Sequence, residues 1–312
     1  MSSKNNAEPL RQRKYIIALN KWHSRLAMIA GFVTVICSLY AIGGSIALYA
    51  ENRANVGELF HWFTTNANCL TAFTACMIIP YALDGIRRKH FSYPQWVARL
   101  HYSGMVCTTL TMVFSLVFIS RVDPQIAFGG YNTYLHIVCP VLVFVSFFLV
   151  ESGRRYSLKD ALFACIPATL YAAIYLAEVC IIGKKNGGWE DLYHILDHMS
   201  PWLVLPAGAL LTVCISLLIR FLYNRLTASR QKRMDAKLWP PDVNPVEINI
   251  EMFGLGRYMG KHTDREFAEL PLSLISRISD RYSLKTEDLI RPYVKGFLDA
   301  AKEREDFSPD TK

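Results

Sequence analysis

The chain has 312 residues, of which 52% are hydrophobic and only 19% are charged, and its formal net charge is +8. A soluble domain normally carries about a quarter of charged residues, so this composition argues against a soluble protein. The net charge alone would suggest a nucleic-acid-binding protein. The basic residues are gathered in alternate connections instead, and we therefore expect no nucleic-acid partner.

Six apolar segments of about 20 residues follow one another, each long enough to cross the hydrocarbon core of a bilayer. They lie at 26–49, 66–84, 98–120, 132–150, 160–182 and 200–223. Short connections between them favour antiparallel packing of neighbouring helices. The sequence predicts an all-α membrane protein, a bundle of six transmembrane helices. Its expected parts are a basic arm (1–25), the membrane domain (26–223) and a small helical tail (224–312).

Lysine and arginine are concentrated in every second connection. Arg87, Arg88 and Lys89 follow the second segment, and Arg154 and Arg155 follow the fourth. Cytoplasmic loops carry such an excess of basic residues, so both termini are predicted to lie in the cytoplasm. The same residues are expected to contact anionic lipid. We therefore predict an integral protein of the plasma (inner) membrane.

The tail begins where prolines interrupt the sixth helix, at Pro240, Pro241 and Pro245. An apolar stripe predicts a helix over 271–282. Thr286 is a suitable cap for a further helix that runs to about Glu305, because Glu287 and Asp288 would lie in its first turn.

Polar residues inside a membrane span are costly and usually have a function. The second helix enters from the outer side, and Thr64, Asn68 and Thr71 share one of its faces, because they are spaced i, i+4, i+7. No comparable set is expected at the inner ends of the spans.

The fourth and fifth helices bring further polar residues to the same outer level. Tyr134 and His136 lie in the first turns of the fourth helix, Glu178 lies near the end of the fifth, and Asp197 lies in the last outer loop. Pro140 has no N–H for the carbonyl four residues earlier, which is that of His136. A kink there would open a polar pocket among the helices.

One interpretation of this set is a nucleophilic catalytic pair. A threonine hydroxyl is almost unreactive unless a base removes its proton, and a neighbouring imidazole meets that requirement. Thr64 would be the nucleophile and His136 its base. Asp197 or Glu178 would orient the ring, and Asn68 would donate to the oxyanion.

Two other interpretations stay open. His194 and His198, spaced i, i+4, would bind zinc with His61 or Asp197. Alternatively, the polar residues are hydrogen-bonding contacts between helices or belong to a transport path. The eight cysteines lie within the spans without a zinc-type spacing, which favours a packing role over metal or redox chemistry.

Three short stretches resemble the androgen-induced-gene family of multipass membrane proteins and its bacterial relatives. They are Phe63-Thr64-Thr65-Asn66-Ala67-Asn68, like the family's FTxxSN; Leu135-His136-Ile137-Val138-Cys139-Pro140, like LLHYVVP; and Tyr193-His194-Ile195-Leu196-Asp197, like YPFLD. Their order and the six-span layout agree with the family, over residues 26–223 and not the tail. Ala67 stands where the family usually has serine, and His194 where it usually has proline.

The resemblance implies an activity and a site. Animal members of the family are similar to one another in hydrolysing fatty acid esters of hydroxy fatty acids with a threonine and a histidine, which would here be Thr64 and His136. We accordingly expect a lipid-ester hydrolase without metal or cofactor, with Asn68, Thr71 and Tyr134 on the substrate side and membrane lipid as partner. The alternative is a non-enzymatic membrane protein, either a small-solute transporter or a scaffold.

Overall fold

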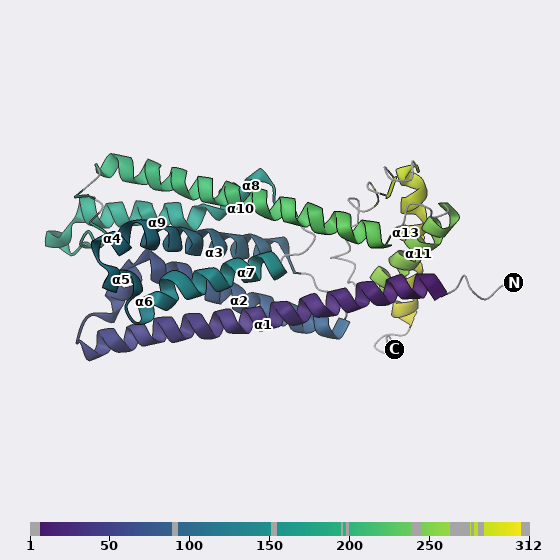
Figure 1. Cartoon of the computed structure of the whole chain (residues 1–312), viewed down its shortest axis with the longest axis horizontal. Coiled ribbons are helices and arrows are strands. Elements are labelled where there is room, and N and C mark those ends of the chain that lie inside the picture. Colours follow the sequence, from purple (N-terminus) through teal and green to yellow (C-terminus); the bar gives the residue numbers. More distant parts are fainter. Residues whose placement is uncertain are drawn as a thin grey trace. The chain divides into compact units, whose positions relative to one another are not determined.

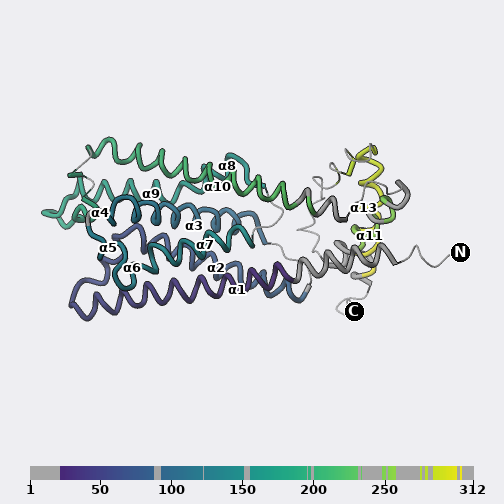
Figure 2. Tube along the Cα trace, viewed as in Figure 1, coloured from purple at the N-terminus to yellow at the C-terminus, as the bar shows by residue number. Residues whose placement is uncertain are grey.

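The computed structural model describes residues 7–88, 93–150, 155–194, 196–197, 200–238, 245–262, 275, 278–279 and 284–306. These ranges consist mainly of helices, and η marks 3-10 or π segments (Figures 1 and 2). In chain order they are α1 (Ala7–Glu51), η1 (Val56–His61), α2 (Phe63–Arg88), α3 (Gln95–Phe114), η2 (Ser115–Ile119), α4 (Ser120–Val122), α5 (Pro124–Phe128), α6 (Tyr131–Thr133), η3 (Tyr134–Val138), α7 (Cys139–Val150), α8 (Leu158–Ala164), α9 (Ile166–Leu176), η4 (Ala177–Ile182), η5 (Lys184–Asn186), α10 (Pro201–Leu238), α11 (Pro245–His262) and α13 (Thr286–Asp306).

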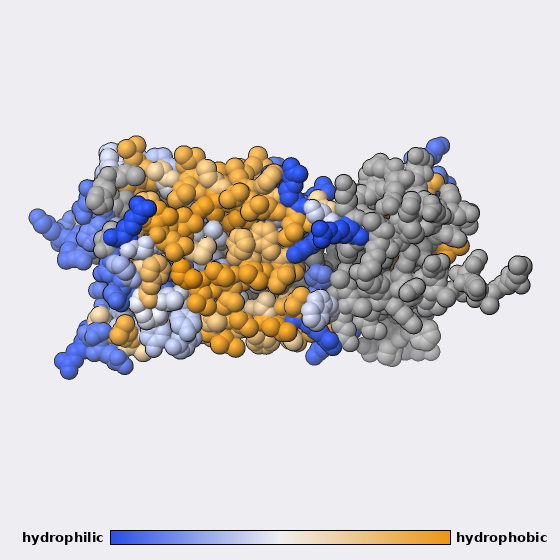
Figure 3. Space-filling view, viewed as in Figure 1, coloured by the Kyte–Doolittle hydropathy of each residue, from blue (hydrophilic) through white to orange (hydrophobic). Residues whose placement is uncertain are grey.

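Six helices in the described ranges are long and apolar enough to cross a membrane. They are Trp22–Glu51, Phe63–Arg87, Gln95–Ile119, Tyr131–Val150, Leu158–Ile182 and Pro201–Arg230. Figure 3 shows the matching band of hydrophobic surface, with hydrophilic residues at both of its ends. The predicted number and order of spans are confirmed, and by the length and composition of its helices the chain is an integral membrane protein.

The bundle is one compact unit, formed by residues 23–83 and 92–229. Successive spans run in opposite directions, so the connections alternate between its two ends (Figure 1). We call the end with the start of α2, η3 and the end of η4 the Thr64 end. The end with the starts of α3 and α8 is the Arg99 end.

Helix α3 is the most buried span, because small residues line the side that neighbouring helices approach. Ser103, Cys107 and Thr108 are inaccessible to solvent, and Gly104 is buried. In a bilayer, helices associate through such close contacts rather than through the hydrophobic effect. Gly104 marks a close approach between α2 and α3, because a Cβ atom there would lie 2.9 Å from the Thr71 methyl carbon of α2.

Replacing Gly104 by alanine is expected to destabilise the bundle by about 1–2 kcal/mol, because Thr71 is β-branched and hydrogen bonded and moves only with its helix. Thermal unfolding of the purified protein in detergent measures the change. Gly208→Ala on α10 is the control, since its added Cβ meets nothing within 4 Å. An unchanged or higher midpoint for Gly104→Ala would contradict this account of the α2–α3 contact.

The remaining residues of the chain (1–22, 84–91 and 230–312) are assigned to a second unit, in which α11 and α13 pack together. Gly256 of α11 and Gly296 of α13 lie directly against each other's helix backbone, at the carbonyls of Tyr293 and Phe253. Ile248, Met252, Ile275, Ile278, Leu289 and Tyr293 form the buried core of this helix pair.

Two differences from the expected tail have simple causes. Helix α10 continues to Leu238, because residues 209–238 contain no glycine or proline. Helix α11 was not predicted, because Pro245 was interpreted as a helix breaker, whereas it is the first residue of α11, where proline is tolerated. The helix expected from Thr286 to about Glu305 is confirmed as α13. Most of the helix expected over 271–282 lies outside the described residues.

Candidate functional site

Thr64 and His136 are in direct contact at the Thr64 end of the bundle. Thr64 Oγ1, in the first turn of α2, lies 3.2 Å from Nε2 of His136, which belongs to the π segment η3. The two side chains are 72 positions apart in the sequence and almost fully buried, with exposed fractions of 6% and 5%. This separation is within the reach that general-base catalysis requires.

The other ring nitrogen fixes the tautomer of His136. Nδ1 lies 2.7 Å from the carbonyl oxygen of Ala127, which can only accept a hydrogen bond. Nδ1 therefore carries the proton, and Nε2 presents its lone pair to Thr64. The Thr64 hydroxyl is then the donor in the Thr64–His136 bond, which is the arrangement of a nucleophile and its base.

The carbonyl that orients His136 belongs to the short helix α5, whose two ends are both capped. At its start, Asp123 accepts hydrogen bonds from the backbone N–H groups of Gln125 and Ile126. At its end, three successive carbonyls accept from side chains of the following segment. The pairs are Ile126 with Asn132, Ala127 with His136, and Phe128 with Thr133. The last carbonyls of a helix lack partners within it, and here they hold the ring in place.

Asn68 connects α2 to the segment that carries His136. In η3, the N–H of Cys139 bonds the carbonyl of Tyr134, five residues back. In this register Pro140 has no N–H to offer the carbonyl of Leu135. The Asn68 amide supplies a donor instead: its Nδ2 lies 3.2 Å from the Leu135 oxygen and 2.8 Å from the Thr64 oxygen.

The orientation of the Asn68 amide is determined by these two carbonyls, because a reversed amide would place oxygen against oxygen. Its Oδ1 is buried and has no hydrogen-bond partner among the described residues. Both amide protons are already used, which corrects the expectation that Asn68 donates to an oxyanion. The residue instead fixes the position of Thr64 relative to His136. The carbonyl expected opposite Pro140 was that of His136; in the π register it is that of Leu135.

The expected carboxylates do not orient His136, because the Ala127 carbonyl occupies Nδ1. Asp197 is exposed and accepts a hydrogen bond from His194 at 3.0 Å. Glu178 is half-buried in η4, and no described residue forms a hydrogen bond with its carboxylate. The expected catalytic roles of Asp197 and Glu178 are therefore wrong for this geometry.

Thr71 and Tyr134, the two other residues expected on the substrate side, face neighbouring helices. Thr71 donates to the Asn68 carbonyl at 2.9 Å and packs against Gly104. The ring of Tyr134 lies edge-on to that of Tyr40 on α1, with 5.0 Å between centroids. Both residues therefore hold the bundle together around the Thr64–His136 pair.

Tyr193, in the connection between the fifth and sixth spans, reaches the site. Its hydroxyl oxygen accepts the backbone N–H of Phe63 at 2.8 Å, next to Thr64. Burial raises the pKa of Tyr193 to about 12. Because burial of the neutral phenol raises this pKa, the stability gained by that burial is complete below about pH 10 and is lost as the pH rises through about 12. The signal for Tyr193 was present in the sequence, since it opens the YHILD stretch.

The structure adds no support for the zinc interpretation. Among the described residues, no three His, Cys, Asp or Glu side chains are placed to hold a metal ion. The ring of His61 is stacked on Trp189, with centroids 4.3 Å apart. His198 lies outside the described residues.

A small cavity lies deeper in the bundle, among α1, α2, α3 and α7. Its polar lining residues are Thr34, Thr71, His101 and Ser146, and it has room for about one water molecule. Thr64 and His136 do not line it. His101, one of these lining residues, is buried and was not among the polar residues singled out from the sequence.

No family model matches the chain, and no curated protein and no solved structure matches it either.

Proposed function

We propose that the chain is an intramembrane hydrolase of a lipid ester, with Thr64 as the nucleophile and His136 as its general base. One observation carries the proposal: the Thr64 hydroxyl lies 3.2 Å from a ring nitrogen whose lone pair faces it. The resemblance of three stretches to the androgen-induced-gene family supports the same activity.

The proposed reaction proceeds in two steps. Thr64 Oγ1 attacks the ester carbonyl carbon while His136 Nε2 takes the hydroxyl proton, and the Ala127 carbonyl stabilises the resulting imidazolium through Nδ1–H. The ring returns the proton to the leaving alkoxide, and the acyl group stays on Thr64. A water molecule then attacks this ester, with His136 as base, and releases the carboxylic acid and the free threonine.

A lipid substrate suits the surroundings of the pair. Both residues lie within apolar spans, where a neutral ester is soluble and a charged substrate is not. Because both side chains are nearly inaccessible, the substrate requires a local opening of the helices. Three π segments, η2, η3 and η4, lie at this end of the bundle, and such segments are frequent at functional sites.

The alternative function is a non-enzymatic membrane protein, and the burial of the pair favours it. Below Thr64, the side chains of Asn68, Thr71 and Thr74 all donate to backbone carbonyls of their own helix. Polar residues satisfied in this way also suit a scaffold, in which the Thr64–His136 bond joins α2 to η3.

Covalent labelling separates the two functions. The purified full chain is treated with a fluorophosphonate probe in detergent, and the adduct is located by peptide mass spectrometry. A hydrolase is expected to carry the adduct on Thr64 and to lose labelling after heat unfolding. Absence of labelling in protein that shows a cooperative unfolding transition would favour the scaffold, as would an adduct on another residue.

A further inference from the structure

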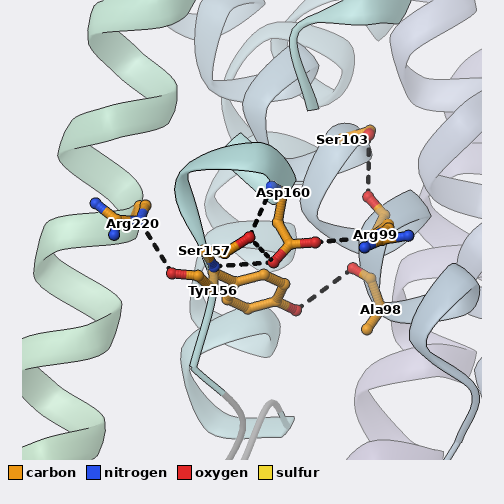
Figure 4. A network of polar contacts seen from close by, with 7 residues as sticks. All are labelled: Ala98, Arg99, Ser103, Tyr156, Ser157, Asp160 and Arg220. Atoms are coloured by element: carbon orange, nitrogen blue, oxygen red, sulfur yellow. Dashed lines mark hydrogen bonds and ion pairs between the residues drawn. The ribbon is translucent and has the colours of Figure 1, made fainter. Parts of the chain in front are cut away.

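At the Arg99 end of the bundle, a buried carboxylate holds an arginine in one orientation (Figure 4). Arg99 Nε donates to Asp160 Oδ1 at 2.7 Å. The other oxygen of Asp160 accepts from the backbone N–H of Ser157 at 2.8 Å and from its hydroxyl at 2.7 Å. The Asp160 side chain is 5% exposed, whereas that of Arg99 is 38% exposed. The carboxylate therefore positions the guanidinium group without covering it.

Most of the donors of this guanidinium group remain available. It has five N–H groups, of which the Nε–H is used by Asp160. No described residue accepts a hydrogen bond from either terminal nitrogen of Arg99. The ring of Phe163 lies beside the group, 5.9 Å from Cζ to the ring centroid. Two terminal nitrogens in a fixed plane match two oxygens of a phosphate.

The surrounding charge favours an anion. Over the described turns at this end of α3, α8 and α10 (95–104, 155–164 and 216–226), only one carboxylate accompanies five basic residues. These residues are Arg99, Arg155, Lys159, Arg220 and Arg225. Arg220 is tethered like Arg99, since its Nε donates to the Tyr156 carbonyl at 2.9 Å. Figure 4 shows these two arginines on opposite sides of the 156–160 segment.

Arg99 lies at the depth of lipid headgroups. Trp96, three residues earlier on α3, is 48% exposed, and exposed tryptophan is typical of the membrane–water boundary. Three residues of helix advance by about 4.5 Å, so Arg99 lies just inside that boundary. Beside it, α8 exposes Leu158, Leu162 and Phe163, a surface suited to acyl chains.

We propose that Arg99 binds the phosphate of an anionic phospholipid, with the lipid's acyl chains along the exposed apolar face of α8. Asp160 is the positioning residue of this site, because fixing the guanidinium group in advance lowers the entropy cost of binding. The nearby lysine and arginines make the site more favourable for a lipid with net negative charge than for a zwitterion. The site is at the opposite end of the bundle from Thr64 and does not depend on the proposed hydrolase activity.

Native mass spectrometry of the full chain in detergent, titrated with phosphatidylglycerol, tests the site. The variant Arg99→Gln with Asp160→Asn removes one charge of each sign, so the net charge is unchanged and any loss must come from the site itself. We expect phosphatidylglycerol to bind this variant about tenfold more weakly. Arg225→Gln, an exposed arginine at the same end, is the control and is expected to weaken binding by less than about threefold.

Equal binding by the double variant and the parent would overturn the proposal, as would an equal loss in Arg225→Gln. Phosphatidylcholine should bind more weakly than phosphatidylglycerol. If inorganic phosphate displaces the lipid at equal concentration, the site takes a soluble anion and the lipid assignment is wrong. Arg99→Lys serves as a second test in case the double variant misfolds. It keeps a positive charge paired with Asp160 but lacks the planar guanidinium fork. It is expected to bind more weakly than the parent, and binding as tight as the parent's would contradict the role of the fork.

Discussion

Hydrolysis of a long-chain ester by the purified protein is expected to fall by about 10²–10⁴-fold when Thr64 is replaced by alanine, and similarly when His136 is replaced by alanine. Thr64→Ala removes the attacking oxygen, and His136→Ala removes the base that is in contact with it. Release of fatty acid from ester substrates in mixed micelles measures the rate. Because the two residues act as one unit, the double variant should lose hardly more activity than either single variant.

Two control variants test whether the loss of activity is due to the Thr64 hydroxyl itself. Thr65→Ala changes a buried threonine next to the pair and is expected to retain most of the activity. Thr64→Ser keeps a hydroxyl at the same place and should retain part of it. A comparable loss in Thr65→Ala would mean that the helix start, rather than the Thr64 hydroxyl, is what the reaction requires.

Replacing Asn68 by alanine is expected to lower the free energy of unfolding by about 2–3 kcal/mol and to reduce the activity together with it. The amide donates to two buried carbonyls on different helices, and its loss leaves the Leu135 carbonyl opposite Pro140 without this donor. The contact between Thr64 and His136 then loses the link that fixes it. Unfolding by heat in detergent and the ester-hydrolysis rate are the two measurements.

Thr74→Val is the matched control for Asn68, because Thr74 is equally buried on the same helix and its hydroxyl bonds only its own helix. A small change is expected in both measurements. If Asn68→Ala changed stability and activity as little as Thr74→Val, then Asn68 would be one more polar residue whose important hydrogen bond lies within its own helix. Its role as a link between α2 and η3 would then be rejected.

The spans and the common level of Thr64 and His136 could be predicted because both depend on the spacing of residue types along the chain, whereas the contact between the two side chains could not. Twenty apolar residues define a membrane helix. A threonine and a histidine near the starts of two spans that begin at the same end of the bundle then come to a similar depth. Asn68 was placed correctly on the face of Thr64, but its role was not, because that role depends on which carbonyls are free.

The missed features depend on the backbone or on pairing between distant segments. The partner of His136 Nδ1 is the carbonyl of Ala127, and a carbonyl has no signature in the sequence. The π register of η3 likewise adds a residue to a turn without any change of composition. Asp160 stands at the first position of the predicted fifth span, and its pairing with Arg99 required knowledge of how α3 and α8 pack.

The bond between Phe63 and Tyr193 has a consequence for the connection between the fifth and sixth spans. The turn that carries Thr64 is held by a residue 130 positions later in the chain. The loop that bears Tyr193 is in turn fastened to α9, because Tyr175 donates to Asp191. A single proteolytic cut within residues 184–187 would leave all six candidate membrane helices intact. It would, however, separate the segment that carries Tyr193 from the end of the fifth span, so that only non-covalent contacts, such as the hydrogen bond from Tyr175 to Asp191, would still join it to α9. An intact connection between the fifth and sixth spans thus helps to hold the first turn of α2 in place.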